Sequence, residues 1–185
     1  GTEPGEDVSL ISLPKNLYVI GTMNLIDQSL EQIDFALRRR FLWWPSRFER
    51  QRLADVLPEL WEKTDTSKRY PWERIAEEMD VFIARAELLN HQIAASNLLG
   101  RDYELGHTYF FKVVDLLERA EYLHRKHRAS RFLWSRKGDP LPPVRDLWRL
   151  SIEPLLDQYL QGVDADSRAA ERARLGKVFL NGQTE

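Results

Sequence analysis

One short segment, residues 17–41 (LYVIGTMNLIDQSLEQIDFALRRRF), combines an amide, a carboxylate and three consecutive arginines. Asn24 and Asp27 follow an apolar run, residues 16–22, whose composition is typical of a buried β-strand. Ligands of α/β sheets bind beyond the carboxyl ends of the strands, where an amide can orient water or a phosphate group. The alternative is that both side chains form a turn or a helix cap, and their spacing alone favours that alternative.

The arginines, Arg38, Arg39 and Arg40, end the helix that follows. A capping-box pattern at Ser29 and apolar residues at helical spacing predict this helix over residues 29–41. The helix dipole favours cations in the last turn, which accounts for one or two arginines better than for three. A guanidinium on a rigid helix end can also neutralise charge on a transferred phosphoryl group, even across a subunit boundary. The combined residues therefore favour nucleotide sensing.

Composition and missing motifs narrow the function further. The chain has 185 residues, no cysteine and 27 Lys and Arg against 29 Asp and Glu, so its overall charge gives no case for nucleic acid. Gly176 and Lys177 are adjacent but lack the rest of a phosphate-binding loop, and no strand ends in paired Mg²⁺-binding acids. No metal site is expected from the histidines. We expect a cytoplasmic chain with no membrane partner that is inactive in NTP hydrolysis alone.

The elements predicted to position these residues are mostly helices. The strand at 16–22 needs sister strands, either from upstream residues or from a short partner such as 41–44. From Pro45 onward, apolar residues recur at helical spacing. The predicted helices span residues 48–61, 72–93, 113–128, 144–160 and 168–180, with a loop at 135–143. The fold is therefore predicted to be mainly α with a small β component, and the domain boundary is placed between residues 1–45 and 46–185.

Three motifs resemble those of the McrB-type AAA+ NTPases, the GTP-dependent motor subunits of 5-methylcytosine-specific restriction systems. The first, LPKNLYVIGTMNLIDQSLEQIDFALRRRF, is similar to the family pattern P-E-N-L-Y-I-I-G-T-M-N-T-A-D-R-S…D-x-A-L-R-R-R-F. LGRDYELGHTYFF and LWRLSIEPLLDQYL resemble L-G…I-G-H-S-Y-F and I-x-P-L-L-E-E-Y-F, in the same order. The resemblance covers about residues 13–160. It implies the C-terminal part of an AAA+ α/β core, with one or two strands, followed by a helical lid.

The resemblance also implies roles for individual residues. Asn24 would be the sensor that contacts the γ-phosphate or the attacking water, and Asp27 would organise arginines at the subunit interface. Arg39 and Arg40 would be trans-acting arginine fingers or interface arginines, while Arg38 could be a structural cation at the helix end. These roles require a ring in which one subunit completes the nucleotide site of the next.

In the lid, the resemblance places Gly106, His107 and Tyr109 in a motif near the nucleotide pocket. A packing or hydrogen-bonding role is expected for His107 in preference to catalysis. The implied cofactor of the intact protein is GTP or ATP with Mg²⁺, and none is expected in this fragment alone. The implied partners are further copies in a homo-oligomeric, hexameric ring and an McrC-type nuclease subunit, with DNA contacted through other domains.

The sequence departs from the family pattern beside the sensor. Leu25 and Ile26 replace the family's T-A, and Gln28 replaces its arginine. The N-terminal sequence GTEPGEDVSL has the composition of a loop, and we expect the chain to begin partway through a larger protein. Function in DNA restriction or phage defence is the interpretation that the resemblance supports.

A basic aromatic segment, residues 119–137, supports an alternative function as a non-enzymatic nucleic-acid-binding or interaction module. It carries seven Lys or Arg against one Glu, with aromatic residues interleaved. Cations can contact phosphates while aromatic rings stack on bases. Arg125, Lys126, Arg128 and Trp134 are the candidate contacts. The competing interpretation is a solvated helix face, on which exposed Lys and Arg are ordinary.

Overall fold

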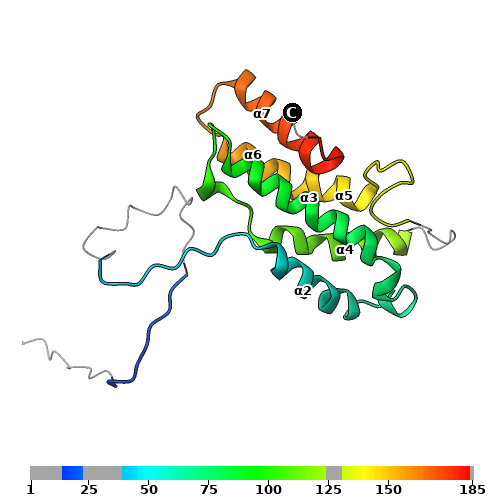
Figure 1. The fold of residues 1–185 in the computed structure, drawn as a ribbon, viewed down its shortest axis with the longest axis horizontal. Coiled ribbons are helices and arrows are strands. Elements are labelled where there is room, and N and C mark those ends of the chain that lie inside the picture. Colours follow the sequence, from blue (N-terminus) through cyan, green and yellow to red (C-terminus); the bar gives the residue numbers. More distant parts are fainter. Residues whose placement is uncertain (1–13, 23–38, 124–130, 184–185) are drawn as a thin grey trace, which may run out of the picture.

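The computed structural model describes residues 14–22, 39–123 and 131–183, and these are mainly helical. An extended N-terminal segment leads into an elongated helical body (Figure 1). The α-helices of the body are α2 Arg50–Glu62, α3 Ala76–Ala94, α4 His107–Leu123, α5 Pro142–Leu147, α6 Glu153–Tyr159 and α7 Ala165–Asn181. Shorter elements are the 3-10 turns η1 Thr66–Lys68, η2 Trp72–Arg74 and η3 Arg101–Tyr103, and the π-helical η4 Trp148–Ile152.

Helix α3 is the central element of the body and packs against both α2 and α7 (Figure 1). Its apolar residues recur at intervals of three and four, so one continuous stripe faces its neighbours. The buried apolar residues of this stripe are Met79, Phe82, Ile83, Ala86, Leu89 and Ile93. The predicted helix over 72–93 is therefore confirmed, with its first turn formed as η2 after Pro71.

Helices α5 and α6 are joined through the π-helical turn η4. Pro154 lies in the first turn of α6, where its missing N–H costs little, and in the π-helical turn before it the hydrogen bond from Glu153 to Trp148 spans five residues in place of four. The predicted helix over 144–160 is therefore divided, and Pro154 lies at the start of its last part, α6. Trp148 of η4 packs on Gly176 of α7, where an added Cβ would lie 3.1 Å from the indole ring.

Helix α7 has a defined stop and start. Asp164 caps its N-terminus by accepting a 2.9 Å hydrogen bond from the N–H of Ser167. Gly182 ends the helix in the left-handed conformation at φ 68°. Arg85 of α3 donates to the carbonyl of Val178 at 3.4 Å, so a cation lies where the dipole of α7 favours it.

The predicted β component is not formed by the described residues. Residues 17–22 and 42–44 are extended chain without a ladder, and a single isolated bridge pairs Trp134 with Pro140. A strand needs a neighbour for its backbone hydrogen bonds, and the described residues offer none to either segment. Most of the predicted helix over 29–41 lies outside the described residues, and Arg39 and Arg40 form a turn.

The remaining helix predictions are confirmed with shifted ends. Helix α4 begins at His107, six residues earlier than the predicted helix over 113–128, and its described part ends at Leu123. Among the described residues, no helix is both long enough and apolar enough to cross a membrane.

Candidate functional site

The two candidate arginines that the structure describes, Arg39 and Arg40, lie in an exposed turn. The candidate sensors Asn24 and Asp27, together with Arg38, lie outside the described residues. The turn precedes the exposed side chains of Phe41 and Leu42. Arg39 and Arg40 are thus accessible to another molecule, and their predicted role stays a prediction.

The lid-motif histidine, His107, joins the start of α4 to the start of α2. Its Nε2 accepts a hydrogen bond from the N–H of Glu49 at 2.9 Å, and its ring stacks on Phe48 with ring centroids 5.3 Å apart. Burial lowers the pKa of His107 below its usual value and the charge of Arg52 lowers it further, while a hydrogen bond to the Glu49 backbone carbonyl and the charge of Glu49 oppose the shift. His107 thus makes packing and hydrogen-bonding contacts of the expected kind, and its nucleotide-sensing or interface role stays a prediction.

Of the two other lid-motif residues, Gly106 directly precedes the same helix and Tyr109 lies in its first turn. The N–H of Tyr109 donates to the carbonyl of Gly106 at 3.2 Å, and Lys112 Nζ lies 5.2 Å from the Tyr109 ring. Gly106 is exposed, and a Cβ there would meet no atom within 4 Å. The motif therefore forms the N-terminal end of α4. The predicted role of Gly106 and Tyr109 near a nucleotide stays a prediction.

The loop that leads into the lid motif is fixed by Asn90, a buried residue that was not predicted from the sequence. Its Oδ1 accepts from the N–H of Leu105 at 2.6 Å, and its Nδ2 donates to the carbonyls of Leu105 and Ala86 at 3.3 Å each. The side-chain amide of Asn90 thus supplies the hydrogen-bond partners that the buried N–H and carbonyl of Leu105 would otherwise need from another backbone segment. A polar residue within the apolar stripe of α3 was the available signal.

A cavity of about 500 Å³ lies beside the lid motif, where the N-terminal segment enters the helical body. It is bounded by the residues before and in the first turn of α2, the C-terminal half of α3 and the loop around η3. Its charged and polar lining residues are Arg47, Arg50, Glu87, Asn90, His91, Arg101 and Glu104. We call this cavity the junction groove.

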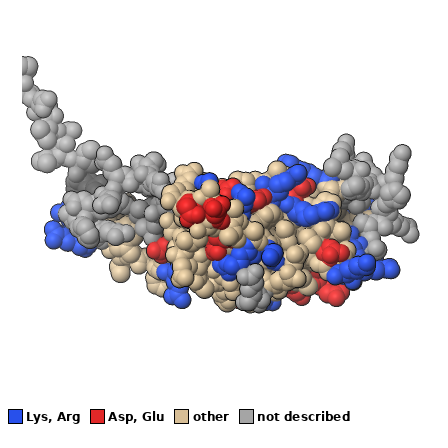
Figure 2. Space-filling model, turned by 90° about the horizontal axis from the view of Figure 1, so that it is seen from above, with Lys and Arg blue, Asp and Glu red and all other residues tan. Residues whose placement is uncertain are grey.

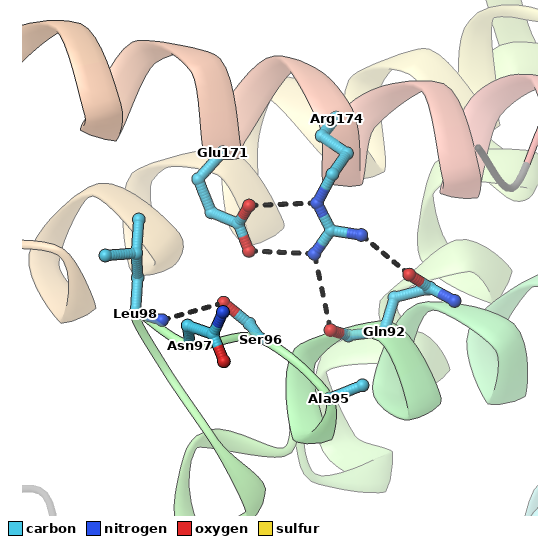
Figure 3. A pocket seen from close by; sticks show the side chains of 7 residues that line it. All are labelled: Gln92, Ala95, Ser96, Asn97, Leu98, Glu171 and Arg174. Carbon is cyan, nitrogen blue, oxygen red and sulfur yellow. Dashed lines mark hydrogen bonds and ion pairs between the residues drawn. The ribbon is translucent and has the colours of Figure 1, made fainter.

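A second cavity, of about 400 Å³, lies between the end of α3 and α7 (Figure 3). Arg174 donates to both carboxylate oxygens of Glu171, at 2.9 and 2.8 Å, and to the side-chain oxygen of Gln92 at 2.6 Å. The pKa of Glu171 is lowered by its hydrogen bonds with Arg174 and Ser96, and the partial burial of Glu171 opposes this shift. These contacts join the two helices, so the cavity is built around a structural ion pair.

The prediction that Trp134 contacts nucleic acid is wrong, because this residue is only 4% exposed. Its Nε1 donates to the carbonyl of Glu78 at 3.1 Å, and the guanidinium of Arg85 lies 5.6 Å from the centroid of its ring. A ring enclosed in this way cannot stack on a base. Arg125, Lys126 and Arg128 lie outside the described residues.

Glu78 holds residues 132–134 of the basic aromatic segment against α3. This carboxylate of α3 is 5% exposed and accepts hydrogen bonds from the N–H groups of Phe132, Leu133 and Trp134 at 3.0, 2.7 and 2.9 Å. Three backbone donors compensate the buried charge. The aromatic residues that follow residue 131 therefore belong to the core.

The surface does not gather one sign of charge on the face that Figure 2 shows. Lys and Arg side chains there are interspersed with Asp and Glu. Within the described ranges, no group of three or more His, Cys, Asp or Glu could hold a metal ion.

Comparison with known proteins yields one partial likeness. No family model matches the chain, and no solved structure matches it. The chain is 31% identical over 101 residues to the type IV methyl-directed restriction enzyme EcoKMcrB subunit of Escherichia coli K12. The matched part makes up 53% of this chain and 19% of that protein. The likeness indicates an McrB-like relationship for a chain that spans only a small part of the relative.

Proposed function

We propose that this chain is part of an McrB-like AAA+ NTPase motor subunit in a modification-dependent restriction or phage-defence system. The observation that carries the proposal is the 31% identity over 101 residues to a restriction-enzyme subunit. The order of the three sequence motifs, from the sensor segment to LWRLSIEPLLDQYL, supports the same relationship. In this proposal, the helical body is the lid of the motor.

The exposure of the N-terminal segment supports the proposal. Leu17, Tyr18, Val19 and Ile20 are between 52% and 92% exposed, although their composition is that of a strand covered on both faces. The helical body has its own core and does not cover them. An AAA+ core in the intact protein would supply the sheet that this segment requires.

The chemistry of the proposed motor is attack of water on the γ-phosphate of GTP or ATP. In the proposal, Asn24 orients the water or the phosphate, and Asp27 organises the arginines between subunits. Arg39 and Arg40 reach the nucleotide of a neighbouring subunit and offset the charge that develops on its phosphoryl oxygens. The phosphate-binding loop and Mg²⁺ belong to another part of the intact protein, which drives an McrC-type nuclease.

The test uses the intact protein, with its phosphate-binding loop. We expect Arg39→Ala or Arg40→Ala to lower NTP turnover by about 1,000-fold while nucleotide binding is retained, because the arginine acts on the transition state. Arg149→Ala, at an exposed arginine of η4, is the matched control. Unchanged turnover in both finger variants would contradict the assignment.

A mixing experiment tests whether the arginines act in trans. Rings that combine Arg39→Ala subunits with subunits lacking the phosphate-binding lysine should recover part of the activity, since some interfaces then hold one intact nucleotide site and one intact arginine. Rings of either variant alone should stay inactive. If mixing restores nothing, the arginine does not act across the interface.

The nucleic-acid-binding module has less support. Phe132 and Trp134 of the basic aromatic segment lie in the core, which removes two of its stacking surfaces. Charge reversal at Arg125, Lys126 and Arg128 would still abolish salt-dependent DNA binding if that function held.

A further inference from the structure

We propose that the junction groove binds a phosphoryl group through Arg47 and Arg101. The proposal goes beyond the motor function and does not depend on it, because it concerns a cavity formed by described residues of this chain alone. The groove has three arginines and two glutamates in its lining. The contacts of each charged group decide which arginines are available to a ligand.

Arg47 is held in place without a strong ionic partner. Its guanidinium donates to the backbone carbonyl of Arg101 at 3.3 Å, which brings the two residues together. Its two ion pairs, with Asp102 and Glu104, are both 4.0 Å long. The Asp102 carboxylate is 70% exposed, so this long pair contributes little and a ligand can replace it at small cost, whereas Glu104 is 17% exposed and stays beside Arg47.

Arg101 is presented by a loop of fixed shape. Gly100 precedes it at φ 99°, and the N–H of Tyr103 donates to the carbonyl of Gly100 at 3.2 Å. The end of the loop is fixed by the bonds between Leu105 and Asn90. Among the described residues, no hydrogen bond or ion pair engages the Arg101 guanidinium, which therefore retains its donors for a ligand.

The remaining charges fit a phosphoryl group better than a single carboxylate. Arg50 is already paired with Glu87 at 3.0 Å, which neutralises that wall of the groove. Asp102 is 70% exposed and can turn toward water. A phosphoryl group has more than one acceptor oxygen and up to two charges, so two guanidinium forks can bind it together.

The experiment titrates this chain with inorganic pyrophosphate at low ionic strength and follows the side-chain Nε–H signals of arginine by NMR, with calorimetry for the affinity. We expect saturable binding that shifts the signals of Arg47 and Arg101, and an affinity at least tenfold weaker in Arg101→Ala and in Arg47→Ala. Arg145→Ala, an exposed arginine on α5, is the control and should bind as the unmodified chain does. Unchanged circular dichroism shows that each variant is folded.

Two results would overturn the proposal: shifts that do not saturate, and equal affinity in Arg101→Ala and Arg145→Ala. Competition then distinguishes the sources of the phosphoryl group. Displacement of pyrophosphate by GTP or ATP indicates a nucleotide, and displacement by a short single-stranded oligonucleotide indicates a nucleic-acid backbone. Loss of NTP turnover in Arg39→Ala has no bearing on this binding, so the two proposals fail separately.

Discussion

The described residues of the N-terminal segment, 14–22 and 39–47, and those of the helical body, 48–123 and 131–183, are both rich in large apolar residues but differ in what covers them. Eight of the eleven strongly exposed large apolar side chains among the described residues lie in the segment. In the body, the buried apolar side chains form one core cluster. The difference shows that apolar composition alone does not produce burial: helices satisfy their own backbones and then pack, whereas an isolated strand needs partners for both backbone and side chains.

The largest test of this comparison uses one tryptophan from each region. Trp61 is fully buried, and its Nε1 donates to the carbonyl of Tyr70 at 2.8 Å. We expect Trp61→Ala to lower the free energy of unfolding by about 4 kcal/mol, through lost burial and the resulting cavity. Trp44 is 93% exposed, so Trp44→Ala should change it by less than about 0.5 kcal/mol. Urea denaturation measures both, and equal losses would show that the segment packs on the body.

A second pair of variants tests how the body fixes its own loop. Glu78→Gln places an amide N–H₂ among three backbone N–H donors, and we expect a loss of about 3 kcal/mol in the free energy of unfolding. The neighbouring Glu77 is exposed, so Glu77→Gln is a control of the same chemistry. The near-UV circular dichroism of the chain, to which Trp134 contributes, should change only in Glu78→Gln. Equal stability of the two variants would show that the Glu78 carboxylate does not stabilise the folded chain.

The same comparison explains what could be predicted from the sequence. The helices were predictable because their apolar spacing is local, as in α3 and α7. The strand at 16–22 was predicted from composition, but a ladder depends on residues distant in sequence. Trp134 was interpreted as exposed because basic residues surround it, whereas Glu78, 56 residues away, determines its burial.

Parts of the candidate site follow the same division. His107 was expected to pack or form hydrogen bonds, and it contacts Phe48 and Glu49, while its nucleotide-sensing or interface role stays a prediction. The junction groove could not be predicted, because Arg47 and Arg101 are 54 residues apart and meet only through tertiary packing. The sensors Asn24 and Asp27 lie outside the described residues, so their roles stay predictions.

A smaller effect is expected from the loop that borders the junction groove. Asn90→Ala leaves the buried N–H and carbonyl of Leu105 without their partner, which should cost about 2 kcal/mol in the free energy of unfolding. Asn97→Ala, at an exposed position, is the control. Hydrogen exchange at the Leu105 amide should accelerate only in Asn90→Ala. If it stays slow there, the loop is held by other contacts.

The smallest expected effect concerns pH and the contact between α2 and α4, next to the point where the segment joins the body. Burial lowers the pKa of His107 in the folded state, so the unfolded chain binds a proton more readily than the folded one. The contribution of His107 to stability is therefore complete above its ordinary pKa of 6.5 and is lost as the pH falls below that value. His107→Gln keeps an acceptor for Glu49 but does not titrate, so its stability should depend less on pH between 5 and 8. His91→Gln, on an exposed histidine, should keep the dependence of the unmodified chain, and identical pH profiles for the two variants would exclude His107 as its source.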